Sequence, residues 1–185
     1  MTLNKENKDI NFWVVIPARL KSTRLKDKLL LKINNIPIIQ HTYNNVCKIE
    51  LITDIIILTD NIKVKNVVDD FINEKHSCHV INEECLNGTE RIIVYLQKYN
   101  KIEYPDDTII VNIQGDEPFI NPYNVDLAIQ NYINKKNKIE NLVCSTIYHQ
   151  TNNYEEIKNK NRGKLVLDEN NNIMYCSRNI IPNNS

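Results

Sequence analysis

The stretch Phe12-Trp-Val-Val-Ile-Pro-Ala-Arg-Leu-Lys-Ser-Thr-Arg-Leu-Lys-Asp-Lys28 joins a short apolar run to a basic loop. The apolar run predicts a buried strand that ends at Pro17. Further short apolar runs predict strands at Asp54–Leu58, Cys78–Ile81, Thr108–Ile113 and Leu142–Ile147. Amphipathic stripes between them predict helices that follow Pro37 or cover residues 64–72, 87–99 and 125–133. Strands that alternate with helices in this way indicate an α/β domain with a mostly parallel sheet flanked by helices.

The two ends of the chain carry different patterns. Residues 1–10 are polar, and we expect this N-terminal stretch to be frayed. Near the other end, apolar segments at 164–167 and 173–177 flank Asp168-Glu-Asn-Asn-Asn172. Because asparagine tolerates positive φ, these segments predict a C-terminal β-hairpin. No repeat or linker interrupts the chain, so we expect a single domain over residues 11–185.

The composition excludes several classes of protein. The 185 residues include 23 basic and 23 acidic side chains, so the formal net charge is zero. This balance argues against bulk attraction to nucleic acid or to an acidic membrane. The sequence shows no secretory signal and no apolar run long enough to cross a bilayer, so we expect a cytoplasmic protein. The five cysteines are odd in number and scattered, which favours neither a disulfide framework nor a zinc site.

The basic loop after the first strand predicts a phosphate-binding site. It carries the guanidinium groups of Arg19 and Arg24, the amine of Lys28 and the hydroxyls of Ser22 and Thr23. Such groups suit the oxygens of a nucleoside triphosphate. A solvated basic turn is the alternative, but ligands of parallel sheets bind outside the carboxyl ends of the strands, where this loop lies. The sequence lacks the G-x-x-x-x-G-K-[ST] pattern of a P-loop.

The turn Gln114-Gly-Asp-Glu-Pro118 places two carboxylates at the end of another predicted strand. We expect Asp116 to bind Mg²⁺, because hard cations favour carboxylate oxygens together with substrate phosphates. Strand alternation would send Glu117 to the opposite face. Gly115 would permit close approach by a ligand, and the alternative for the acidic pair is a helix cap.

A third stretch, Asn87-Gly-Thr-Glu-Arg91, allows two interpretations. Asn87 or Thr89 could cap the following helix. Alternatively, Gly88 and the amides at the start of the helix could receive a base or a phosphate.

Four motifs together carry a family resemblance. They are Ile16-Pro-Ala-Arg-Leu-Lys-Ser-Thr-Arg-Leu25, Asn87-Gly-Thr-Glu-Arg91, Val111-Asn-Ile-Gln-Gly-Asp-Glu-Pro118, and Tyr175-Cys-Ser-Arg178 with Pro182. In this order they resemble the 3-deoxy-manno-octulosonate cytidylyltransferases, also called CMP-Kdo synthetases. The resemblance implies a Rossmann-like layered sandwich and Mg²⁺-dependent transfer of CMP from CTP to the acidic sugar Kdo. It implies CTP and Kdo as partners and allows a homodimer.

The resemblance also implies roles for individual residues. Arg19, Lys28 and Asp116 would be catalytic, with Asp116 as the Mg²⁺ ligand. Gln114 and Arg178 would face the sugar acid. The residues implied to bind the nucleotide are Ala18, Arg19, Ser22, Thr23, Arg24, Lys28, Asn87, Gly88 and Thr89.

The chain departs from the family pattern in three places. Asp27 and Leu29 stand where relatives have Gly and Pro, and Asn35 and Ile36 replace a Gly-Lys pair. Family chains also continue beyond the point that matches Ser185, with a second Mg²⁺-binding Asp, much of the Kdo pocket and part of the dimer interface. The alternatives are therefore another sugar nucleotidylyltransferase on the same fold, or a nucleotide-binding descendant without catalysis.

Overall fold

The computed structural model describes residues 10–20, 25–99, 108–136, 138–139 and 141–182. The chain forms two compact units, Met1–Ser145 and Thr146–Ser185. The expectation of one domain over residues 11–185 stays a prediction. Residues 1–9 of the N-terminal stretch that we expected to be frayed lie outside the described residues.

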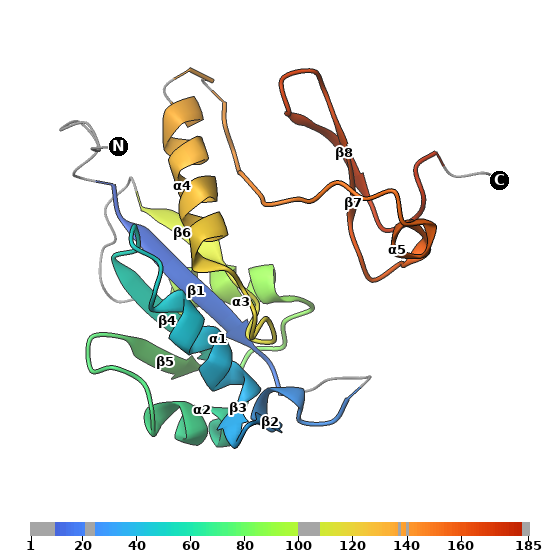
Figure 1. Cartoon of the computed structure of the whole chain (residues 1–185). Helices are drawn as coiled ribbons and strands as arrows, with labels where there is room; N and C mark the ends of the chain where they lie inside the picture. Colours follow the sequence, from blue (N-terminus) through green and yellow to red (C-terminus); the bar gives the residue numbers. More distant parts are fainter. Residues whose placement is uncertain (1–9, 21–24, 100–107, 137, 140, 183–185) are drawn as a thin grey trace. The chain divides into compact units, whose positions relative to one another are not determined.

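The first unit is built on a four-stranded parallel sheet with the order β5-β4-β1-β6 (Figure 1). Its strands are β1 Phe12–Ala18, β4 Asp54–Thr59, β5 Ser77–Val80 and β6 Ile109–Asn112. Along β1, Val14 and Ile16 face one hydrophobic cluster, whereas Val15 faces the other, because side chains alternate across a sheet. The sheet is therefore buried on both faces, as the short apolar runs predicted.

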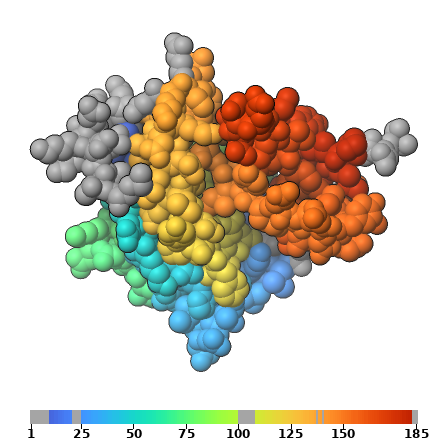
Figure 2. All heavy atoms as spheres, turned by 45° about the horizontal axis from the view of Figure 1, so that its top comes forward, coloured from blue at the N-terminus to red at the C-terminus, as the bar shows by residue number. Residues whose placement is uncertain are grey.

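Helices cover both faces of this sheet. The helices α1 Ile38–Val46, α2 Ile62–Asp69 and α4 Pro122–Lys136 share one apolar cluster with the sheet. In Figure 2, α4 in yellow and orange lies beside α1 in cyan. The opposite cluster contains α3 Gly88–Val94 and the π-helical turn η3 Tyr95–Tyr99. This layered arrangement confirms the predicted α/β fold.

The segment between the basic loop and α1 holds structure that no sequence pattern predicted. A short 3₁₀ helix, η2 Lys28–Leu30, precedes the two-stranded hairpin of β2 Lys32–Ile33 and β3 Ile36–Pro37. Asp27 has φ 52°, and Asn34 and Asn35 have φ 49° and 65°. Asp and Asn tolerate this left-handed region better than other non-glycine residues. The departures at Asp27 and Asn35 therefore preserve the backbone conformation that a glycine would favour.

The strand predicted at residues 142–147 is wrong. These residues form no ladder and follow an irregular path. A strand persists only where a neighbour accepts its hydrogen bonds, and the described sheet ends at β6. Of the apolar side chains that suggested a strand, Val143 and Ile147 are solvent-exposed, at 88% and 46% exposure.

The second unit contains the predicted hairpin. β7 Lys164–Leu167 pairs antiparallel with β8 Ile173–Ser177. Asp168 Oδ1 accepts the amides of Asn170 and Asn172 across the turn, and Asn171 has φ 60°. A short helix, α5 Tyr154–Lys158, was not predicted. Among the described helices of both units, none combines the length and apolar character needed to span a membrane.

Candidate functional site

The loops after β1, β4 and β5 surround one cleft at the carboxyl edge of the sheet, with a volume of about 790 Å³. Because the strands are parallel, their carboxyl ends meet at this edge. The cleft is lined by Arg19, Leu20, Lys26, Asp27, Asp60, Asn61, residues 81–85 and Arg91. The basic loop and the start of α3 therefore contribute to the same concave surface, as expected from their positions after strands.

An ion pair connects the basic loop to the acidic turn. Lys28 Nζ lies 2.6 Å from Asp116 Oδ2, and the two side chains are 37% and 43% exposed. The two residues are 88 positions apart in the chain, so the fold brings the end of the basic loop to the turn Gln114–Pro118. The groups expected to hold phosphate and Mg²⁺ are thus in direct contact with each other.

Asp116 is the carboxylate that we expect to bind a metal ion. Among the described residues, no group of three or more His, Cys, Asp or Glu side chains could hold a metal ion. Mg²⁺ in phosphate-transferring sites is commonly bound by one or two carboxylates plus substrate phosphates. Asp116 would therefore supply one ligand to such an ion, and the phosphates of a bound nucleotide would supply others.

Glu117 differs from Asp116 in its electrostatic surroundings. Desolvation of the carboxyl group raises the pKa of Glu117, and the negative charge of Asp116 raises it further. Its backbone amide donates to the Gln114 carbonyl at 3.2 Å, which closes the turn. The two neighbouring carboxylates are therefore not equivalent.

Gly115 is required for packing rather than for the ligand approach that we expected. Its amide donates to the Pro17 carbonyl at 3.1 Å, and its carbonyl accepts the Thr42 hydroxyl at 3.0 Å. A Cβ at this position would lie 3.0 Å from Ile39 Cδ1 and 3.2 Å from the Pro17 oxygen. The space beside the glycine is therefore filled by the protein itself.

Replacement of Gly115 by alanine should lower the free energy of unfolding by about 1–3 kcal/mol, the usual cost of overpacking. Urea unfolding followed by circular dichroism measures this change. Gly163→Ala is the matched control, because a Cβ there meets nothing within 4 Å. Equal stabilities for the two variants would contradict the packing role of Gly115.

Asn87 caps α3 through its side chain. Its Oδ1 accepts the Glu90 amide at 2.9 Å, while Glu90 Oε2 accepts the Leu86 amide at 2.6 Å. This reciprocal pattern resembles a capping box. Gly88 lies close to Pro17, since a Cβ would approach the Pro17 Cγ to 2.8 Å, and it lies near Gln114 Oε1. The geometry supports the capping interpretation, and contact of Asn87, Gly88 or Thr89 with a nucleotide stays a prediction.

Asn87→Ala should lower the free energy of unfolding by about 1 kcal/mol, because the cap is lost. Asn87→Ser should remain close to the wild type, because serine is also a good N-cap. Chemical denaturation of the two variants provides the measurement. Equal destabilisation by serine and alanine would show that capping is not the role of this side chain.

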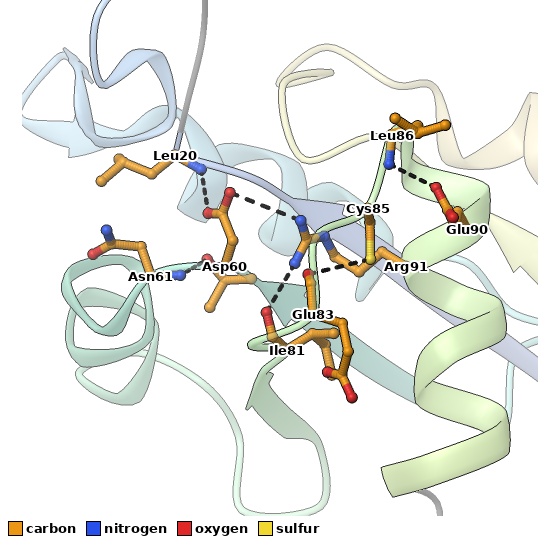
Figure 3. A network of polar contacts seen from close by, with 10 residues as sticks. Leu20, Asp60, Asn61, Ile81, Glu83, Cys85, Leu86, Glu90 and Arg91 are labelled. Atoms are coloured by element: carbon orange, nitrogen blue, oxygen red, sulfur yellow. Dashed lines mark hydrogen bonds and ion pairs between the residues drawn. The ribbon is translucent and has the colours of Figure 1, made fainter.

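Two residues at the centre of the site were not singled out from the sequence. Asp60 directly follows β4, and its Oδ1 accepts the Leu20 amide at 2.8 Å. Its Oδ2 lies 3.8 Å from the guanidinium of Arg91, whose Nη1 donates to the Ile81 carbonyl at 3.3 Å (Figure 3). The position of Asp60 at the end of a buried strand was the available signal, but its partners are distant in the chain.

The remaining predicted site residues lie in the first unit, in the second unit or outside the described residues. Ala18 is buried at the end of β1, whereas Arg19 is exposed on the cleft. Gln114 Nε2 donates to Asn112 Oδ1 at 3.0 Å. Arg178 belongs to the second unit, where its Nη1 donates to backbone carbonyls at 3.2 and 3.4 Å. The predicted nucleotide-binding residues that lie outside the described residues are Ser22, Thr23 and Arg24.

Comparisons with known proteins identify the family. A family model described as cytidylyltransferase matches residues 13–185. The chain is 38% identical over 172 residues to the 3-deoxy-manno-octulosonate cytidylyltransferase of Francisella tularensis subsp. novicida. It is 36% identical over 174 residues to the protein of that name from Colwellia psychrerythraea. These matches cover 93% and 94% of this chain but only 64% and 60% of the relatives.

The solved structures agree with this assignment. A structure of CMP:2-keto-3-deoxy-manno-octonic acid synthetase complexed with CTP matches with a TM-score of 0.72 and 26% identity, covering 93% of this chain and 66% of that one. A cytidylyltransferase from Leptospira borgpetersenii has the same fold, with a TM-score of 0.56 over 70% of this chain and 52% of that one, at 20% identity. This chain belongs to the cytidylyltransferase family.

Proposed function

We propose that the chain takes part in the activation of Kdo by CTP, giving CMP-Kdo and pyrophosphate. The relatives named above and the CTP-bound synthetase structure support this substrate pair. The chain spans about 64% of the first relative. The activity of the whole protein and its two substrates are therefore proposed for this chain, together with the homodimer that the family resemblance allows.

The observation that carries the proposal is the contact between Lys28 and Asp116 at the carboxyl edge of the sheet. A cation suited to phosphate and a carboxylate suited to a hard metal ion lie within 2.6 Å of each other. Arg19, exposed on the neighbouring cleft, provides a second cation. A nucleoside triphosphate with its metal ion requires this combination of charges.

In the proposed reaction, the anomeric hydroxyl oxygen of Kdo forms a bond to the α-phosphorus of CTP, and the bond from that phosphorus to the bridging oxygen breaks. Pyrophosphate leaves, and the hydroxyl proton passes to solvent. Arg19 and Lys28 would hold the triphosphate in line for the attack and neutralise its oxygens. Mg²⁺, bound at Asp116 together with the phosphates, would supply Lewis-acid stabilisation of the charge on the leaving group.

Pyrophosphate release by this chain with CTP, Kdo and Mg²⁺ tests the proposal. Release is expected only when CTP and Kdo are both present, and UTP should not replace CTP. Isothermal titration of the same protein with CTP should be run in parallel. CTP binding without release would favour the nucleotide-binding alternative. The absence of both signals would refute the proposed function.

A further inference from the structure

The ion pair of Asp60 and Arg91 links three loops at the carboxyl edge of the sheet. Asp60 follows β4, Leu20 follows β1, and Ile81 follows β5. The carboxylate accepts the Leu20 amide, and the guanidinium donates to the Ile81 carbonyl. Figure 3 shows Asp60 between Leu20 and Arg91, with Arg91 reaching from α3. One side-chain pair therefore fixes the spacing of the loops that surround the cleft.

Arg91 is the buried member of this pair, and Asp60 is partly exposed. Arg91 is only 3% exposed, and the Asp60 side chain is 22% exposed. A buried guanidinium is costly unless it is paired and hydrogen-bonded, and its planar shape fixes the direction of its donors. Arg91 is held by its hydrogen bond to the Ile81 carbonyl, and its positive charge lies 3.8 Å from Asp60 Oδ2. This charge attracts the Asp60 carboxylate, whose other oxygen accepts the Leu20 amide.

The Leu20 amide lies next to the residue expected to bind phosphate. Arg19 precedes Leu20 in the chain and is exposed on the same cleft as Asp60 and Arg91. A hydrogen bond to the amide after Arg19 restricts the peptide between the two residues, and so limits the directions that the Arg19 side chain can take. A charge-assisted hydrogen bond from a guanidinium to phosphate contributes about 1.5–3 kcal/mol, and a displaced Arg19 would lose it.

We propose that Asp60 is a positioning residue for nucleotide binding, with Arg91 as its support. Asp60 acts by holding the Leu20 amide so that Arg19 faces the triphosphate. This inference rests on the proposed binding of CTP. It predicts that loss of the carboxylate weakens CTP binding by about 10- to 100-fold in protein that remains folded, the worth of one charge-assisted hydrogen bond.

Asp126 offers a matched control for a purely structural role. Its carboxylate is also largely buried, at 9% residue exposure, and accepts the backbone amides of Glu50 and Leu51 at 3.1–3.2 Å. These amides precede β4, at the amino end of the sheet and away from the cleft. Asp126→Ala therefore also removes a carboxylate that accepts backbone amides, but it does not disturb the basic loop.

The experiment measures CTP affinity by isothermal titration in Mg²⁺ buffer, at a temperature below the lowest melting temperature of the variants. Asp60→Ala should bind CTP about 10- to 100-fold more weakly than wild type, whereas Asp126→Ala should lose melting temperature but not affinity. Asp60→Asn should restore much of the affinity, because its amide oxygen can still accept the Leu20 N–H. Hydrogen exchange at the Leu20 amide should accelerate in Asp60→Ala but not in Asp60→Asn or Asp126→Ala.

Asp60→Ala leaves the buried Arg91 charge without its partner and could unfold the chain. The double variant Asp60→Ala/Arg91→Met removes both charges and should fold while still binding CTP weakly. Wild-type affinity in the folded double variant would overturn the inference. An equal loss of affinity in Asp126→Ala would also overturn it, because the effect would then follow from general destabilisation. If the wild type itself binds no CTP, the proposed function fails and the inference falls with it.

Discussion

Asp116→Ala should lower the rate of pyrophosphate release by about 100- to 1,000-fold, the usual effect of removing a group that stabilises transition-state charge. The same change should leave metal-free CTP binding intact or slightly stronger. The reason is the 2.6 Å contact with Lys28, because removal of the carboxylate frees this lysine for the phosphates. The measurements are steady-state pyrophosphate release and titration with CTP in the presence of a chelator.

Glu117→Gln is the matched control for this prediction, since it neutralises the adjacent carboxylate of the same turn. The wild-type rate is expected for Glu117→Gln, because the proposed metal ligand is Asp116, which contacts the phosphate-binding Lys28. An inactive Glu117→Gln beside an active Asp116→Ala would assign the metal-binding role to the other carboxylate. Direct titration with Mn²⁺ in the presence of CTP then shows which variant has lost the ion.

The parts of the fold that depend on local sequence were predictable. The hairpin segments 164–167 and 173–177 match β7 and β8, since apolar segments flanking an Asn-rich turn are a local signal. The strand at 142–147 failed because an apolar run cannot reveal whether a partner strand is available. For residues 142–147, the local pattern therefore could not predict whether a strand forms.

The candidate site was predictable in its motifs but not in its side-chain contacts. The loop after β1 and the turn at Gln114–Pro118 were identified because both follow buried strands. The contact between Asp60 and Leu20 joins residues 40 positions apart, and no spacing rule indicates it. Gly115 was assigned to ligand approach because the sequence does not show that Ile39 and Pro17 fill the space beside it. Contacts between distant loops depend on tertiary packing, which a single sequence does not display.

Lys28→Met should have opposite effects on the two ligands of the site. CTP affinity should fall by about 10- to 100-fold, because a charge-assisted hydrogen bond to phosphate contributes about 1.5–3 kcal/mol. Affinity for Mn²⁺ without nucleotide should rise by about twofold to fivefold, because the exposed ion pair that now occupies Asp116 is worth about 0.2–1 kcal/mol. Methionine keeps the length and apolar stem of the side chain while removing only its charge.

Isothermal titration with CTP and electron paramagnetic resonance of Mn²⁺ measure these two affinities on the same protein. Lys26→Met is the control, because Lys26 is a neighbouring cation that also lines the cleft. Its loss should reduce CTP affinity less and leave Mn²⁺ affinity unchanged. A fall in both affinities in Lys28→Met would indicate a distorted site, and unchanged Mn²⁺ affinity would show that the Lys28–Asp116 pair does not compete with the metal. Opposite changes would mean that Lys28 exchanges Asp116 for phosphate when the nucleotide arrives, so that metal and CTP enter the site together.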